Sequence, residues 1–219
     1  MKRNPVTLAI FGILFCDVQA AVLTFDISGI SNFDNVDQGY GDNISAATIG
    51  GFSYGAEEGF TPNLTVDYGG SDPSLWTNGY GSLTNVLFEN QDNTGVLVIT
   101  ISAEPGYEAR LHRFDLSAFN SVFSSSPTID TVGVGTAGAV EAFRQDDVVI
   151  SETDFTQFSF TPTIQSSEII IVVDARNLGG LNDDIAIDNI VFSQVAVPEP
   201  SSTILMGLAA FGFVARRKR

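Results

Sequence analysis

Short runs of apolar residues, separated by turns rich in Gly, Asn and Asp, dominate residues 21–197. This stretch carries no long run with the helical period of hydrophobic residues. Many short strands spaced about ten residues apart are typical of an antiparallel β-sandwich. We therefore expect one all-β domain over residues 21–197, hereafter called the ectodomain.

The predicted strands share a high content of Val, Ile, Phe and Thr. They span residues 22–27, 85–89, 95–102, 139–144, 148–151, 154–161, 168–174 and 185–193. The unbroken apolar run Ile169–Val173 predicts a buried strand in the centre of a sheet. Polar turns at residues 90–94 and 145–147 predict two β-hairpins, each joining the strands on either side of the turn.

The N-terminal end has the layout of a secretory signal peptide. Two basic residues are followed by an apolar stretch over residues 6–16 and by small residues that end at Ala20. We expect signal peptidase to cleave after Ala20, so that residues 1–20 are removed. A lipoprotein signal at Cys16 would need a small residue before it, where Phe15 stands. Cys16 is the only cysteine, so the mature chain can form no internal disulfide bond.

The C-terminal end combines a short apolar segment with a basic terminus. Residues 203–215 carry no charge, and as a helix they would reach only ~20 Å against a hydrocarbon core of ~30 Å. The bases at 216–219 favour a cytoplasmic C-terminus. Pro198 and Pro200 keep the preceding segment out of a helix. Taken alone, these features predict a short transmembrane helix that is a marginal membrane anchor.

The same end resembles the bacterial PEP-CTERM sorting signal. The resemblance rests on an ordered set of three features: the Pro-Glu-Pro segment, the apolar helix and the basic end. Its residues are Val197, Pro198, Glu199, Pro200, Arg216, Arg217, Lys218 and Arg219. The resemblance implies that residues 198–219 are a sorting signal, held briefly in the inner membrane and recognised there by an exosortase. The protein is then expected at the cell surface or in the extracellular matrix.

The ectodomain is strongly acidic. It has four Arg and no Lys against 24 Asp and Glu, which gives a net charge of −20. Such a field repels phosphates, so the charge excludes nucleic acid as a partner. It favours cations, although solubility outside the cell explains the same charge.

Four segments of the ectodomain resemble parts of other PEP-CTERM ectodomains. They are Phe25-Asp26, 79–87, 111–115 and 185–192. The resemblance implies a jelly-roll, galactose-binding-like sandwich. It implies no activity for particular residues.

Two groups of acids are candidate calcium ligands, because calcium prefers carboxylate and carbonyl oxygens. The first lies in the loop 32–43 and the second at the last predicted strand. The candidates are Asp34, Asp37 and Asp42, and Asp183, Asp184 and Asp188. Neither group has EF-hand spacing, and acids solvated in turns are the alternative interpretation.

Aromatic residues near Asp and Asn suit sugar recognition, since rings stack on the apolar faces of sugars. Trp76, Tyr80 and Tyr68 form such a group within residues 67–80. The alternative is that Trp76 anchors the core or a loop.

Motifs of catalysis are weak. Glu152-Thr153-Asp154 resembles the ExDxxE of some sandwich glycosidases, but Gln157 stands in place of the third acid. His112 is the only histidine, and nothing in the sequence assembles a triad around it. The GxGxxG match at 133–138 lacks the following helix that a dinucleotide site needs.

We therefore interpret the chain as an exported, non-enzymatic β-sandwich protein, a possible component of the polysaccharide matrix. A carbohydrate-binding module, with exopolysaccharide as partner, is the first alternative. A hydrolase that uses two carboxylates is the second. No cofactor other than structural calcium is expected.

Overall fold

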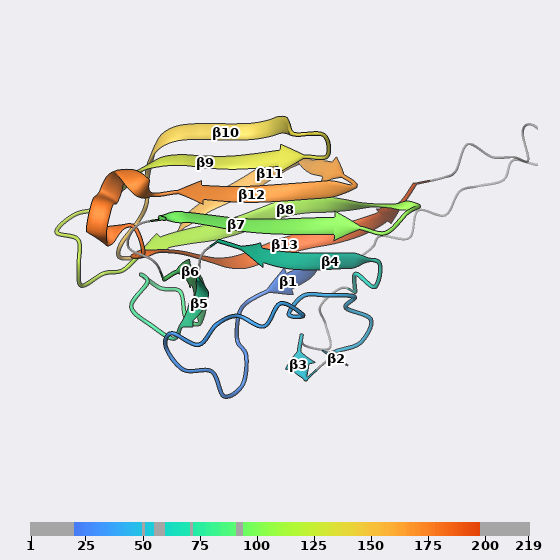
Figure 1. Cartoon of the computed structure of the whole chain (residues 1–219), viewed down its shortest axis with the longest axis horizontal. Helices are drawn as coiled ribbons and strands as arrows, with labels where there is room; N and C mark the ends of the chain where they lie inside the picture. Colours follow the sequence, from blue (N-terminus) through green and yellow to red (C-terminus); the bar gives the residue numbers. More distant parts are fainter. Residues whose placement is uncertain (1–19, 50, 55–59, 71, 91–93, 198–219) are drawn as a thin grey trace, which may run out of the picture.

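The computed structural model describes residues 20–197, apart from residues 50, 55–59, 71 and 91–93. The expected signal peptide, except for Ala20, and the expected sorting signal at 198–219 lie outside the described residues. The described part is a sandwich of two antiparallel sheets, with long loops of the N-terminal third at one side (Figure 1). The predicted all-β sandwich is confirmed.

Six strands form one sheet and five form the other. The first sheet runs in the order β11 (Thr156–Ser166), β8 (Tyr107–Ala118), β13 (Ile185–Ala196), β6 (Val86–Glu89) and β5 (Pro73–Trp76), with β1 (Ala21–Leu23) also paired to β13. The second runs in the order β10 (Val140–Val149), β9 (Thr128–Thr136), β12 (Glu168–Asp174), β7 (Val96–Ala103) and β4 (Leu64–Gly69). A small pair, β2 (Thr48–Ile49) and β3 (Phe52–Ser53), and the 3₁₀ helix η1 (Arg176–Leu181) complete the described elements.

The strand pairing is that of a jelly roll. β9 pairs with β10, β8 with β11, β7 with β12 and β6 with β13, so each pair encloses the previous one along the chain. Successive pairs alternate between the two sheets. A long antiparallel ribbon rolled into two sheets gives this order, which confirms the expected jelly roll.

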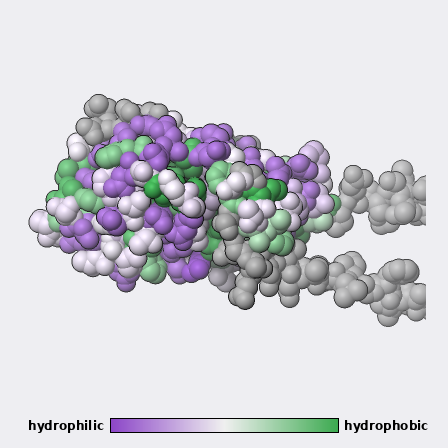
Figure 2. Space-filling view, turned by 90° about the horizontal axis from the view of Figure 1, so that it is seen from below, coloured by the Kyte–Doolittle hydropathy of each residue, from purple (hydrophilic) through white to green (hydrophobic). Residues whose placement is uncertain are grey.

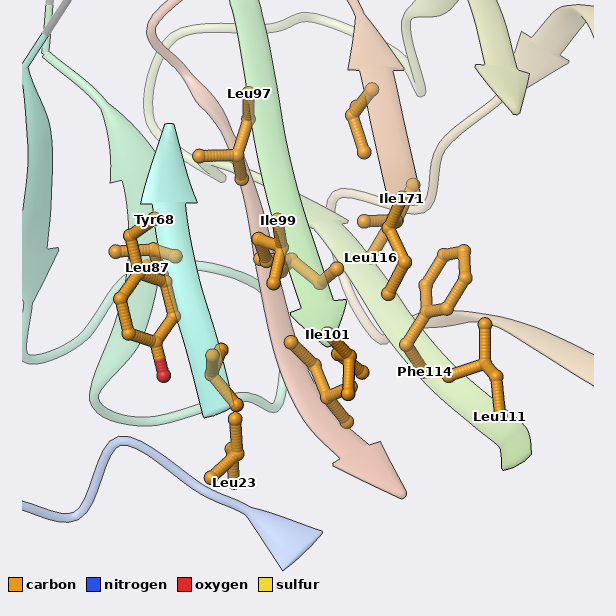
Figure 3. Close-up of a cluster of buried hydrophobic side chains, with 14 of the residues drawn as sticks. Leu23, Tyr68, Leu87, Leu97, Ile99, Ile101, Leu111, Phe114, Leu116 and Ile171 are labelled. Atoms are coloured by element: carbon orange, nitrogen blue, oxygen red, sulfur yellow. The ribbon is translucent and has the colours of Figure 1, made fainter. Parts of the chain in front are cut away.

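The core fills the space between the sheets, while the outer face shown in Figure 2 is a mixture of hydrophilic residues and scattered hydrophobic ones. On β12, Ile169, Ile171 and Val173 are buried, while Ile170 and Val172 are half-buried on the other face. Alternate residues of a strand point to opposite faces, so one face of β12 packs inward. Figure 3 shows Ile171 and Ile99 of this sheet beside Phe114 and Leu116 of the other. The strand at 168–174 is confirmed with its predicted bounds and lies at the centre of its sheet.

Both predicted hairpins are wrong. β6 pairs with β5 and β13, and β7 pairs with β4 and β12, so β6 and β7 belong to different sheets and are not partners in a hairpin. A five-residue polar loop can serve either purpose, and the wider pairing of the roll decides it. The second predicted turn, at 145–147, lies within β10, where the strand continues through Asp147 at φ 51°.

The turn that joins β9 to β10 lies instead at residues 137–139, with Gly138 and Ala139 at φ 80° and 58°. The exposed polar residues of β10 reflect its position at a sheet edge rather than a turn. The first predicted strand is also shorter than expected: β1 ends at Leu23, and Phe25 lies at φ 52°.

Candidate functional site

A cleft lined by aromatic side chains lies beside β5 and β6, and the segments that follow β8 and η1 complete its lining. Its volume is about 130 Å³. The lining residues, hereafter the aromatic cleft, are Phe33, Trp76, Tyr80, Phe88, Phe119, Asp183 and Asp184. Two of the three predicted sugar-binding residues, Trp76 and Tyr80, therefore lie in one cavity.

Sheet alternation separates these rings from the main core. Leu87 of β6 packs in the core, whereas Val86 and Phe88 belong to a second apolar cluster with Tyr80 and Ala186. Neighbouring residues of a strand point to opposite faces, so this second cluster lies on the outer face of the six-stranded sheet. Trp76 and Phe119 pack against it.

The rings of the cleft meet at steep angles. The indole of Trp76 lies 4.7 Å from Phe33 at 89°, 6.0 Å from Phe88 at 89° and 5.6 Å from Phe119 at 80°, between ring centroids. Edge-to-face contacts of this kind are favoured by the ring quadrupole. The indole Nε1 of Trp76 is buried and has no hydrogen-bond partner within the described structure. The surface that Trp76 exposes is therefore carbon.

Glycine and backbone hydrogen bonds hold the loops together around the cleft. Gly79 lies at φ 94°, and a side chain there would collide with the ring of Phe119. The Phe119 amide donates to the Asp184 carbonyl at 2.9 Å, and the Asn120 amide donates to the Gly79 carbonyl at 2.8 Å. These two hydrogen bonds join three segments that are distant in sequence, at residues 79, 119–120 and 184.

The pKa of Tyr80 reflects its burial and the charges that line the cleft. Its hydroxyl donates to the Asp183 carbonyl at 3.2 Å, and the side chain is almost fully buried. Burial raises the pKa of Tyr80 well above its usual value, and the negative charges of Asp184 and Asp183 raise it further. The cleft is therefore an electronegative environment.

Tyr68 lies elsewhere. It alternates with Leu64 and Val66 on β4, which places it in the core, where it is 3% exposed. Its hydroxyl donates to the Tyr40 carbonyl at 2.8 Å. The three predicted sugar-binding residues therefore do not form one site. Sequence analysis missed Phe33 and Phe119, which come from segments far from Trp76 along the chain, and Phe88, which lies on the neighbouring strand β6.

The predicted calcium ligands of the loop 32–43 accept hydrogen bonds from backbone amides. Asp34 accepts from Ser31 at 2.6 Å, Asp37 from Gly39 at 2.8 Å and Asp42 from Val66 at 2.7 Å. The local contacts of Asp34 and Asp37 are typical of carboxylates that shape turns, whereas the contact of Asp42 joins the loop to β4. Within the described ranges, no three His, Cys, Asp or Glu side chains form a group that could hold a metal ion.

The predicted acids near the last strand separate into two places. Asp183 and Asp184 line the aromatic cleft, whereas Asp188 lies on β13 opposite Asp115 of β8. Asp115 accepts hydrogen bonds from the Gln157 amide at 3.0 Å and the Asn189 amide at 3.1 Å. Burial raises the pKa of Asp188 to about 8, and the charges of Asp26 and Asp115 act in the same direction.

The residues considered for catalysis are not assembled into a known catalytic arrangement. His112 Nε2 lies 2.8 Å from Ser193 Oγ, and burial, followed by the charge of Arg110, lowers the pKa of His112. Ser82 donates to the Asp154 carboxylate at 2.6 Å, and Glu152 Oε2 is buried without a hydrogen-bond partner in the described structure.

The GxGxxG residues lie on the β9–β10 hairpin. Gly133 and Gly135 line a shallow groove of about 430 Å³ on the outer face of the five-stranded sheet, with Arg144 and Arg176 nearby. Each arginine is paired with an aspartate, Asp146 and Asp174 respectively. The segment is a strand and a turn, as expected from the absence of a following helix.

Comparison with known proteins identifies the C-terminal end. Residues 196–219 match the PEP-CTERM protein-sorting motif, which confirms the resemblance noted in the sequence. This motif implies an exported protein that an exosortase sorts to the cell surface. No curated protein matches the chain.

One similar solved structure is the family 32 carbohydrate-binding module of C. perfringens NanJ in complex with galactose. The TM-score is 0.29 and the sequence identity 9%, covering 60% of this chain and 93% of that chain. A likeness of this size says nothing about the ligand of the present chain. Among the described residues, no helix has the length and apolar character needed to cross a membrane.

Proposed function

We propose that the chain is a non-enzymatic β-sandwich protein that is displayed at the cell surface or in the extracellular matrix after exosortase removes its C-terminal segment. The observation that carries this proposal is that the last strand of the domain ends where the sorting motif begins. The last strand pair is Ala196 with Tyr107, and the Val197 amide donates to the Gly106 carbonyl at 2.8 Å. The motif begins at residue 196, so a cut beyond Pro200 would leave every described strand in the mature protein.

Mass spectrometry of the surface and secreted fractions tests the sorting proposal. We expect mature protein without residues beyond about Ser202, and accumulation of uncut protein when Glu199 and Pro200 are both replaced by Ala. Replacement of Ser201 and Ser202 by Ala is the matched control and should leave processing intact. Intact Arg216–Arg219 in the mature surface protein would contradict the proposal.

A carbohydrate-binding function is the second candidate. It is favoured by the aromatic cleft, which combines Trp76 and Tyr80 with two carboxylates at one end of the sandwich. Binding on a glycan array that is lost in Trp76→Phe, and retained in the core-facing control Tyr68→Phe, would support it. Array binding that survives Trp76→Phe would argue against this cleft.

The proposal that the protein is not an enzyme has its own test. Polysaccharide turnover by the protein, abolished in Glu152→Gln and retained in Glu141→Gln, would contradict it and establish the hydrolase alternative. Glu141 is an exposed residue of β10 and so controls for the loss of one charge.

A further inference from the structure

We infer that the aromatic cleft binds the positively charged amino group of an amine-bearing saccharide, such as a polymer with unacetylated glucosamine units. This inference rests on the carbohydrate-binding function proposed above and names its ligand class. Three independent properties of the cleft carry it: its shape, its charge and the surface that its tryptophan exposes.

The rings of the cleft surround Trp76 at steep angles instead of sharing one plane, and Phe33, at the edge of the cleft, is 55% exposed. The planes of Phe33, Phe88 and Phe119 stand at 80° or more to the plane of Trp76. Tyr80 and Phe88 are almost fully buried and form the base. A sugar that stacks needs one broad, exposed ring face, whereas perpendicular rings enclose a compact group. The volume of about 130 Å³ is close to the ~150 Å³ cavity that accommodates benzene, so the cleft holds one small group rather than several sugar units.

The charge of the cleft selects a cation. Asp183 and Asp184 line it, and no Lys, Arg or His is among its described lining residues. The negative faces of aromatic rings attract ammonium groups, and the attraction grows when water is excluded. The effect of both aspartates on Tyr80 shows that their field reaches the base of the cleft. An anionic group would be repelled both by these residues and by the acidic ectodomain.

The exposed surface of Trp76 also favours an ammonium group. Because its Nε1 is buried, the half-buried indole presents carbon to the cleft instead of a hydrogen-bond donor. Recognition of neutral sugar hydroxyls depends on placed donors and acceptors, while an ammonium group needs π surface and carboxylates. The side chains of this cleft supply π surface and carboxylates, the groups that an ammonium ion needs.

The test uses Trp76, the only tryptophan of the chain, as a fluorescent probe in the full-length protein. Glucosamine oligomers and N-acetylglucosamine oligomers of equal length are titrated at a pH at which the free amines are protonated. We expect the amine form to change the fluorescence and to bind at least tenfold more tightly. Tetramethylammonium, which carries the charge without the sugar, is expected to compete for the site.

Charge-matched variants separate the cleft from general attraction to an acidic protein. Asp183→Asn with Asp184→Asn is expected to weaken binding of the amine oligomer at least tenfold. Asp67→Asn with Asp147→Asn, two exposed acids on β4 and β10, makes the same change in charge and should leave binding nearly unchanged. Phe119→Leu, assayed with its melting temperature, removes one ring and should also weaken binding.

The outcomes are distinct. Equal binding of both oligomers would overturn the inference of an ammonium site and leave the carbohydrate-binding function standing. No binding of either oligomer would also overturn the inference, whereas the carbohydrate-binding function itself is overturned only if the protein binds no glycan on the array. Equal loss in the cleft variant and in its charge-matched control would also overturn the inference, because the attraction would then be general.

Discussion

Asp115 of β8 and Asp188 of β13 face each other across neighbouring strands, and both are buried on the outer side of the six-stranded sheet. Only 2% of Asp115 and 4% of Asp188 is exposed. Side-chain amides of Gln157 and Asn189 donate to Asp115, and the Asn189 backbone amide donates to Asp188 at 2.6 Å. Burial, together with the charges of Asp26 and Asp115, raises the pKa of Asp188 to about 8, so Asp188 binds a proton near neutral pH.

We predict that Asp188→Asn makes the protein more resistant to rising pH. The pKa of Asp188 is about 8 in the folded state, above the value of ~3.9 for an unfolded chain, so the folded state binds more protons between these values. The free energy of unfolding contributed by the protonated group is present below pH ~4 and is lost as the pH rises through 8. The difference between the two pKa values corresponds to at most roughly 6 kcal/mol of unfolding free energy.

Urea unfolding of the wild type and of Asp188→Asn at several pH values measures this effect. The difference between the two proteins should grow from pH 5 to pH 8, because Asn keeps the acceptor for the Asn189 amide and cannot ionise. Asp147→Asn, an exposed acid on β10, is the control. A difference that stays constant over this range would show that Asp188 does not titrate there.

We predict that Ile171→Ala destabilises the domain by about 2–5 kcal/mol, because it leaves a cavity in the core between the sheets. Ile170→Ala, one residue away on the half-buried face, should cost only about 1 kcal/mol. Thermal unfolding is the measurement, with roughly 2–4 °C expected for each kcal/mol. Equal losses in the two variants would contradict the assignment of faces on β12.

Calcium remains a proposal, and its removal is the third prediction. Calcium at about a hundred times its Kd is expected to raise the melting temperature by about 5–10 °C, since an ion that binds only the folded state stabilises it. Magnesium should replace it poorly because it demands a strict octahedral shell. Loss of the effect in Asp42→Asn or in Asp183→Asn would locate the ion. An unchanged melt in chelator would leave solvated turn acids as the explanation.

The elements that sequence analysis located correctly are those fixed by local pattern. The run Ile169–Val173 specifies a strand by itself, and β12 has the predicted bounds. The pairing of β6 could not be read in the same way, because its partner β13 lies about a hundred residues later in the chain. A polar loop at 90–94 looks the same whether it turns back within a sheet or crosses to the other sheet.

The residues of the aromatic cleft divide in the same way, into those that local sequence indicated and those that only the strand pairing brings together. Residue type and nearness in sequence predicted Trp76 and Tyr80 as neighbours in one site, and both line the aromatic cleft. Phe119 and Asp184 join them only because β8 and β13 are paired, so their nearness depends on the topology. The left-handed φ of Gly79 and its contact with Phe119 were likewise not visible in the sequence.

The position of β13 constrains the order in which the chain can mature. β1 begins at Ala21, the first residue after the expected signal cleavage, and Ala21 pairs with Phe192 near the other end of the domain. β13 also pairs with β6 and β8, so the six-stranded sheet lacks its centre until residues 185–196 have been delivered. If the chain crosses a membrane from its N-terminus, as we propose, the six-stranded sheet cannot be completed until the residues just before the sorting motif have crossed. We therefore expect the sandwich to close only after translocation of β13, the strand that directly precedes the sorting motif.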